Sequence, residues 1–217
     1  MMEREVRSLE FELRAEETGN ENRAGRITGT PIVFGEWTDR GWCMEQIAPG
    51  ALNQTDLRDV RFLVGHDFES IPLARSRNNN ENSTMQMTVT ERGMEIRVDL
   101  DIVNNPRAKE LYSAVKRGDI SGMSFAFLVD KDRWDDLDTD MPKRTIESIS
   151  KVIEVSAVAF PQYEGTDLQA ASKDGSLDSG RASLESAREQ LKADRIAQAE
   201  QERRTALLDR LNKLMEV

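Results

Sequence analysis

The chain has 217 residues, 38% of them hydrophobic and 32% charged, with a formal net charge of -10 at pH 7. The length and the low apolar share predict one folded domain plus a segment outside its core. The acidic charge argues against a nucleic acid partner, because no basic field would attract a polyanion.

Cysteine usage and the N-terminal residues indicate an intracellular protein. Cys43 is the single cysteine, so no internal disulfide is expected. The first residues lack the apolar core of a secretory signal, and no stretch approaches the roughly 20 apolar residues that span a bilayer. A zinc site would need mostly carboxylates here, since the chain has one histidine. We therefore expect a soluble protein with no cofactor, no metal and no membrane partner.

The N-terminal half of the chain predicts short β-strands, because apolar and polar residues alternate and β-branched runs end in turn residues. These strands cover residues 6–15, residues 26–34 with an interruption at Pro31, residues 41–52 up to the Pro49-Gly50 turn, and residues 61–67. The last of them places His66 at its end. The clearest signal is a β-hairpin over residues 84–101, whose apolar residues alternate on both sides of a turn containing Gly93.

A single helix is framed at both ends. Asn105 is a suitable N-cap, Pro106 suits the first helical position, and Gly118 lies beyond the end. Two β-rich segments follow, residues 120–129 and residues 145–161. Many strands with one framed helix predict a mainly β domain, either a barrel or a sandwich with helices added.

The segment between these β-rich stretches, residues 130–143, is rich in aspartate and is predicted to be a polar loop. Oxygen ligands at alternate positions suggest calcium, but the central glycine and the terminal glutamate of an EF-hand are missing. We therefore interpret the segment as a solvated connector and predict no metal.

After Ala171 the composition changes. Residues 172–180 are rich in Ser, Gly and Asp, which is typical of a linker, whereas residues 181–217 contain no Gly or Pro and predict a long helix. The apolar positions of this helix are too sparse for a self-sufficient coiled coil. The expected division is a β-barrel domain over residues 1–171 and a linker with a C-terminal helical tail over residues 172–217.

A serine hydroxyl is a weak nucleophile that needs an imidazole within hydrogen-bond reach, and His66 is the only imidazole in the chain. A lone histidine is more often structural than catalytic. Ser124 lies in an otherwise apolar strand, where a hydroxyl that only fills space would be unusual. The alternative is that Ser124 bonds a neighbouring carbonyl, and the same holds for Ser121, the second candidate nucleophile.

Glu154 is the most informative acid, because Ile153 and Val155 flank it in the most apolar segment of the chain. An ionised carboxylate among such residues needs a partner or must face solvent. An imidazole would be a suitable partner. Simple alternation, with Glu154 on an outer face of the sheet, is the other interpretation.

At these residues the chain resembles the prohead, or capsid-maturation, serine proteases of tailed bacteriophages. The resemblance runs from about residue 26 to residue 171 through an ordered series of motifs: PIVFGEW, EQIAPGAL, FLVGHD followed by PLARS, ERGMEIRVDLD, KRGDISGMSFAF and IEVSAVAFPQYEGTDLQA. It implies a fold related to herpesvirus assemblin, a closed β-barrel with helices packed around it.

The resemblance also implies site residues. It assigns His66 as the base, Ser124 as the nucleophile and Glu154 as the third member of a triad. The herpesvirus enzymes use a second histidine in the third position, which this chain lacks, so Asp67 and Glu147 compete with Glu154 for the role. Their oxyanion site further suggests an arginine, for which Arg144 and Arg75 are candidates. Ala126 replaces a glycine of the phage motif.

The implied activity is endopeptidase cleavage of the internal scaffold, of the major capsid protein and of the enzyme itself. It would take place inside the assembling prohead in the host cytoplasm, with self-association expected. We further expect the tail to dock the protein into the scaffold or to be removed by self-cleavage. The alternative function is a catalytically inactive capsid protein that binds scaffold.

Overall fold

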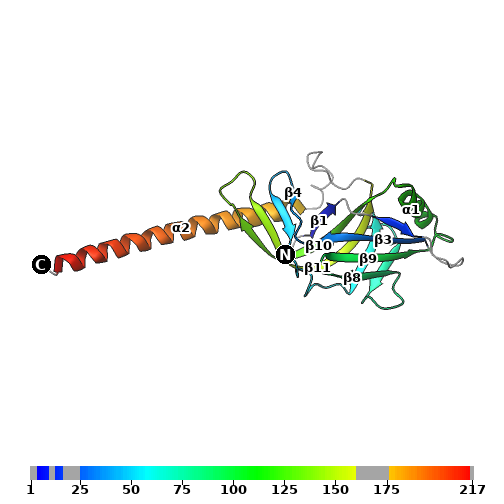
Figure 1. Cartoon of the computed structure of the whole chain (residues 1–217), viewed down its shortest axis with the longest axis horizontal. Coiled ribbons are helices and arrows are strands. Elements are labelled where there is room, and N and C mark those ends of the chain that lie inside the picture. Colours follow the sequence, from blue (N-terminus) through cyan, green and yellow to red (C-terminus); the bar gives the residue numbers. More distant parts are fainter. Residues whose placement is uncertain (1–3, 10–12, 17–24, 160–175, 216–217) are drawn as a thin grey trace. The chain divides into compact units, whose positions relative to one another are not determined.

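The computed structural model describes residues 4–9, 13–16, 25–159 and 176–215 (Figure 1). The chain divides into two compact units, Met1–Leu177 and Asp178–Val217. The described part of the first unit is mainly β, with α1 (Pro106–Arg117) as its helix. The second unit consists of most of α2 (Ser176–Met215). The expected mainly β class with a C-terminal helix is therefore confirmed.

The described strands form two sheets. The larger has seven strands: β1 (Arg4–Leu9), β10 (Gly122–Asp135), β11 (Lys143–Val158), β5 (Met44–Ile47) and β4 (Thr38–Asp39) in that order, with β6 (Asp59–Val64) on β11 and β7 (Ala74–Arg77) on β6. The smaller has the order β2 (Arg14–Glu16), β3 (Gly25–Val33), β9 (Gly93–Leu100) and β8 (Met85–Val89). These described strands do not close into a barrel, so that expectation is not confirmed.

Strands β10 and β11 form the long antiparallel centre of the larger sheet. β1 pairs with the other edge of β10, while β5 and β6 both run parallel to β11, at its two ends. The predicted loop over residues 130–143 is wrong for its first part, since β10 continues to Asp135. Charged residues extend the strand because they face opposite charges on β11, as in the pair of Lys131 Nζ with Glu147 Oε2 at 2.7 Å.

The single strand predicted over residues 6–15 is also wrong. β1 pairs with β10 in the larger sheet, whereas β2 pairs with β3 in the smaller one. Residues 10–12, between them, lie outside the described residues. An alternating pattern specifies which face of a strand is buried, but not which partner the strand takes, so it continues across a change of sheet.

Other local predictions are confirmed. The ladder of β3 with β9 has an irregularity between Gly29 and Ile32, around Pro31, and β8 with β9 forms the predicted hairpin. Asn105 Oδ1 accepts from the backbone N–H of Arg107 at 3.1 Å, and the helix ends at Gly118 with a left-handed φ of 81°.

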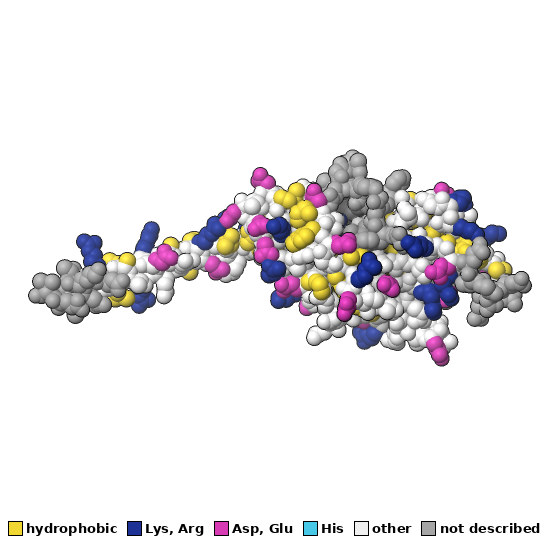
Figure 2. All heavy atoms as spheres, in the orientation of Figure 1, with side chains coloured by type: hydrophobic (Ala, Val, Ile, Leu, Met, Phe, Trp, Pro, Cys, Tyr) yellow, Lys and Arg dark blue, Asp and Glu magenta, His cyan; other side chains and the backbone are white. Residues whose placement is uncertain are grey.

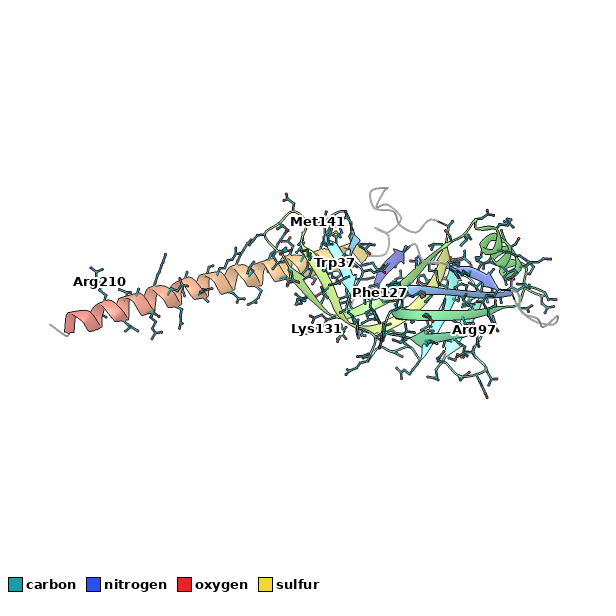
Figure 3. The ribbon with its side chains drawn as sticks, viewed as in Figure 1. Trp37, Arg97, Phe127, Lys131, Met141 and Arg210 are labelled. Carbon is teal, nitrogen blue, oxygen red and sulfur yellow. The ribbon has the colours of Figure 1, made fainter. Side chains whose placement is uncertain are left out.

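The hydrophobic core of the first unit lies between the two sheets and under α1. The rings of Phe125 and Phe127 stack at 4.8 Å on β10, and Figure 3 shows Phe127 among the strands. On the face drawn in Figure 2, acidic and basic side chains of this unit are interspersed. The residues of β10 from Gly122 to Phe127 are all buried, which makes this segment a poor place for an unpartnered hydroxyl.

Helix α2 begins at Ser176, inside the expected linker, so the linker prediction is wrong for residues 176–180; residues 172–175 lie outside the described residues. Pairs three and four residues apart support the helix, such as Gln190 with Asp194. Its large apolar side chains are mostly exposed: Ile196, Leu207, Leu208 and Leu211. Within the described residues, no helix is both long and apolar enough to cross a membrane.

Candidate active site

His66 lies in a tight turn directly after β6, which ends at Val64. The backbone N–H of Gly65 donates to the carbonyl of Ala157 at 3.0 Å, which continues the parallel pairing of β6 with β11. Gly65 and His66 then both have a left-handed φ of 60°. Such a φ is strained for a residue with a Cβ, and strain of this kind is concentrated at functional sites. The turn directs the imidazole toward β10 and β11.

Three serines lie in one row across three strands. Ser8 on β1 pairs in register with Ser124 on β10, and Ser124 pairs with Ser156 on β11. Directly opposed residues of neighbouring strands share a face of the sheet. Glu154 lies two residues before Ser156 and is therefore on this same face. The row and the carboxylate surround the imidazole of His66.

The structure brings the three predicted residues together. His66 Nε2 lies 2.6 Å from Ser124 Oγ, and His66 Nδ1 lies 2.6 Å from Glu154 Oε1. Ser124 and Glu154 are fully buried, while the His66 side chain is 18% exposed. A carboxylate on Nδ1 accepts its proton and leaves Nε2 free to accept another. This arrangement can transfer the Ser124 proton to His66.

The competing acids lie elsewhere. Asp67 accepts a hydrogen bond from Ser70 and pairs with Arg107 at 3.6 Å. Glu147 is paired with Lys131 and Arg133 on the outer face of β10, and these hydrogen bonds lower the pKa of its carboxyl. Neither acid contacts the imidazole. Ser121, the second candidate nucleophile, is exposed just before β10 begins.

Two serines of the row were not predicted as site residues from the sequence. Ser8 Oγ donates to Ser124 Oγ at 2.7 Å, and Ser156 Oγ donates to Glu154 Oε2 at 2.5 Å. Ser156 had a detectable signal, because a residue two positions from Glu154 in a strand shares its face. Ser8 had none, because the partner of the first strand cannot be inferred from its own alternation.

The Ser124 hydroxyl has a second acceptor for its proton. The Arg7 carbonyl on β1 lies 2.9 Å from Ser124 Oγ, compared with 2.6 Å for His66 Nε2. A hydroxyl carries one proton, so these two acceptors compete for it. Strand β1 therefore touches the hydroxyl both through this carbonyl and through Ser8.

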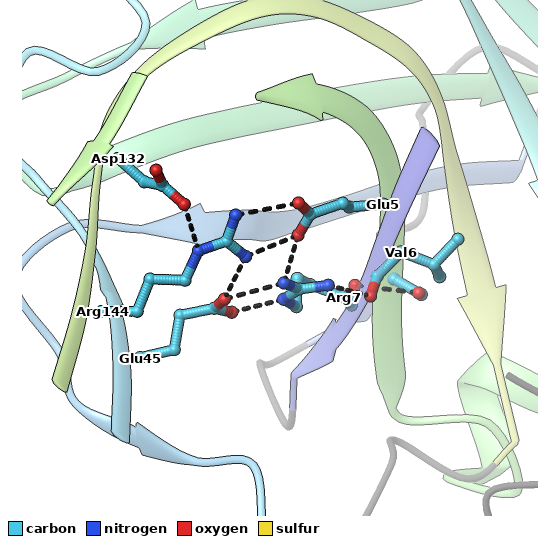
Figure 4. Close-up of polar contacts among 7 residues, drawn as sticks. Glu5, Val6, Arg7, Glu45, Asp132 and Arg144 are labelled. Atoms are coloured by element: carbon cyan, nitrogen blue, oxygen red, sulfur yellow. Dashed lines mark hydrogen bonds and ion pairs between the residues drawn. The ribbon is translucent and has the colours of Figure 1, made fainter. Parts of the chain in front are cut away.

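An ionic cluster of five buried or partly buried residues holds β1 in place: Glu5, Arg7, Glu45, Asp132 and Arg144 (Figure 4). Arg7 Nη2 donates to Glu45 Oε2 at 2.7 Å, and Arg144 Nη2 donates to Glu5 Oε1 at 2.9 Å. Burial alone would raise the pKa of Glu45, but the neighbouring guanidinium groups, Arg7 foremost and Arg144 with it, together outweigh burial and lower that pKa to about 2. The cluster lies on the opposite face of β1 from Ser8.

Both arginines considered for the oxyanion site are engaged in ion pairs with acidic residues. Arg144 is 1% exposed, and its guanidinium is held by Glu5, Glu45 and Asp132. Arg75 is partly exposed and donates to Asp59 Oδ1 at 2.5 Å. Neither is among the contacts of Ser124 or His66, so neither is supported as an oxyanion residue. In the described part of the chain, no group of three His, Cys, Asp or Glu side chains is placed to hold a metal ion.

Comparisons with known proteins identify the family of the chain. A family model described as caudovirus prohead serine protease matches residues 9–178. No curated protein matches the chain. Among solved structures, that of the bacteriophage T4 capsid assembly protease, gp21, is similar with a TM-score of 0.38 and 13% identity, over 71% of this chain and 98% of that one. The predicted resemblance is confirmed, and because the family model covers most of the sequence, this chain belongs to the caudovirus prohead serine protease family.

Proposed function

We propose that the protein is a serine endopeptidase in which Ser124 is the nucleophile, His66 the general base and Glu154 the residue that orients and charge-stabilises the imidazole. One observation supports this most strongly: the unbroken hydrogen-bonded series from Ser124 Oγ through both ring nitrogens of His66 to Glu154 Oε1, with two contacts of 2.6 Å. Serine nucleophiles need this arrangement of base and orienting acid.

The proposed chemistry proceeds in two stages. Ser124 Oγ attacks the scissile carbonyl carbon while its proton passes to His66 Nε2, and Glu154 stabilises the imidazolium that forms. The C–N bond then breaks, the departing amine takes the proton from Nε2, and an ester to Ser124 remains. Water attacks that ester with His66 again accepting a proton, which releases the acid and restores the Ser124 hydroxyl.

The substrates that we propose are the internal scaffold and the major capsid protein, together with the enzyme's own termini. The prohead named in the family description supports this setting, inside an assembling shell in the host cytoplasm. Self-association of the enzyme is part of the same proposal. The tail helix α2 has exposed apolar residues between Ile196 and Leu211, which suits docking to the scaffold; removal of the tail by self-cleavage is the other role that we propose for it.

The decisive test is the variant Ser124→Ala. It should fold like the wild type yet fail to cleave scaffold, capsid protein or itself when proheads are assembled with it. Ser121→Ala is the matched control, because Ser121 is exposed three residues earlier and should leave cleavage unchanged. Processing that continues in Ser124→Ala would end the assignment.

A second candidate function is a catalytically inactive protein that binds scaffold or capsid. The full burial of Ser124, with Arg7 and Ser8 of β1 on its hydroxyl, favours this alternative. A fluorophosphonate probe separates the two functions, because it phosphonylates only an activated serine. Labelling at Ser124 supports the protease, whereas protein that stays unlabelled at pH 7 to 8 in assembled proheads supports the binding protein.

A further inference from the structure

One buried hydroxyl outside the proposed triad touches two of the triad residues. Ser156 is fully buried on β11 and contacts two triad members at once. Its Oγ donates to Glu154 Oε2 at 2.5 Å and accepts the backbone N–H of His66 at 3.1 Å. Its single proton is used on the carboxylate, so Ser156 is not a second nucleophile.

The contact to the backbone of His66 lies where regular strand pairing has ended. The carbonyl of Ala157 accepts the Gly65 N–H at 3.0 Å, and the Ser156 hydroxyl takes the next N–H, that of His66. The left-handed φ of 60° at His66 is strained for a residue with a Cβ. A hydrogen bond to this N–H offsets part of that strain and keeps the turn in the form that places the imidazole.

The contact to Glu154 fixes the other end of the imidazole. Glu154 is fully buried, with Oε1 on His66 Nδ1 and Oε2 on Ser156. A carboxylate held by only one oxygen can rotate about its last side-chain bond, whereas one held by both cannot do so without breaking a bond. Removing the Ser156 hydroxyl would also leave a buried carboxylate oxygen and a backbone N–H without these partners.

We propose that Ser156 is a positioning residue for the triad. It holds the backbone of His66 and the carboxylate of Glu154 in a fixed position relative to each other. The inference rests on the proposed function, because only a reacting Ser124 makes that relative position matter for catalysis. Ser156 touches no reacting atom; it acts through His66 and Glu154.

The first measurement is the rate of phosphonylation of Ser124 by a fluorophosphonate probe, resolved into probe affinity and the maximal inactivation rate. Ser156→Ala should lower the maximal rate by about 10²-fold, the effect of an ångström-scale misplacement. The probe affinity should stay the same, because Ser156 does not contact the probe. Ser156→Thr keeps the hydroxyl and should restore most of the rate.

The second measurement does not depend on reactivity. His66 is the only histidine of the chain, so a low-field imidazole N–H proton resonance belongs to this residue, and the bond to Glu154 makes it the Nδ1 proton in the proposed triad. The resonance should be present in the wild type and in Ser156→Thr, and it should broaden or vanish in Ser156→Ala. Ser156→Cys, whose thiol is a weak donor, replaces the alanine variant if that variant does not fold.

The matched control is Ser76→Ala. Ser76 is equally buried, on β7, and its Oγ has no hydrogen-bond partner within the described residues. This control should change neither the labelling rate nor the resonance. Wild-type-like labelling and an intact resonance in Ser156→Ala would overturn the positioning role. A wild type that shows a Ser156-dependent resonance but never labels would support the positioning role while contradicting the proposed protease function.

Discussion

Ser8 and Ser124 face each other across the ladder of β1 and β10, and the Ser8 hydroxyl donates a hydrogen bond to Ser124 Oγ at 2.7 Å. This bond stabilises the resting alcohol, because it is donated to the oxygen from which electron density must leave during attack. Strand β1 thus lowers the nucleophilicity of the Ser124 hydroxyl that the proposed mechanism needs.

Replacing Ser8 with alanine should therefore raise the phosphonylation rate of Ser124. A neutral hydrogen bond contributes about 1 kcal/mol, so the increase should reach about five-fold. Second-order rate constants for the probe, measured for the wild type, Ser8→Ala and the remote Ser76→Ala, check this. A slower Ser8→Ala variant would instead mean that the hydroxyl assists the transition state.

Glu154→Gln should retain the fold but lose about 10⁴-fold in reactivity. The glutamine amide can donate to His66 Nδ1, which favours the tautomer with the proton on Nε2, and that nitrogen then cannot accept the Ser124 proton. Labelling kinetics measure the loss. Asp67→Asn and Glu147→Gln serve as controls that should stay within about two-fold; a large loss in either would transfer the role of third member to that acid.

Acid stability should depend on Glu45. Its folded-state pKa is about 2 against an ordinary value of 4.5, because Arg7 and the other arginines beside it together outweigh burial. A lowered pKa means stability that is complete above about pH 4.5 and is lost as the pH falls toward 2. Glu45→Gln should lose about 3–5 kcal/mol at pH 7 and flatten this acid limb, as measured by urea unfolding.

The control for Glu45 is Glu147→Gln, which removes a partly exposed pair and should cost less than about 1 kcal/mol. If Glu45→Gln unfolds at the same urea concentration as the wild type across this range, the ionic cluster does not stabilise β1.

Deletion of residues 172–217 should separate packaging from catalysis. The truncated protein should label at Ser124 at the wild-type rate, because the triad lies within His66–Glu154, but it should be incorporated poorly into proheads. Quantifying the protein in purified proheads, beside full-length Ser124→Ala as an uncleaved reference, measures this. Normal incorporation of the truncated form would refute docking through the tail.

Local features of this protein followed from the sequence alone. The caps Asn105 and Gly118 bound α1, the hairpin with Gly93 formed, and His66 lies close to the end of a strand, since these depend on backbone preferences within a few residues. The ordered motifs also identified the family. The charged end of β10 was missed, because its extension depends on opposite charges on β11 rather than on its own composition.

Only the tertiary structure decided which residues meet. The alternation of β1 predicted a strand but not its place beside β10, so neither Ser8 nor the Arg7 carbonyl could be assigned to the nucleophile. That Glu154 rather than Asp67 contacts the imidazole likewise required coordinates. Periodicity along a strand specifies its buried face, whereas packing of the whole chain selects its neighbouring strands. The site consists of side chains on neighbouring strands, so the sequence alone could not assemble it.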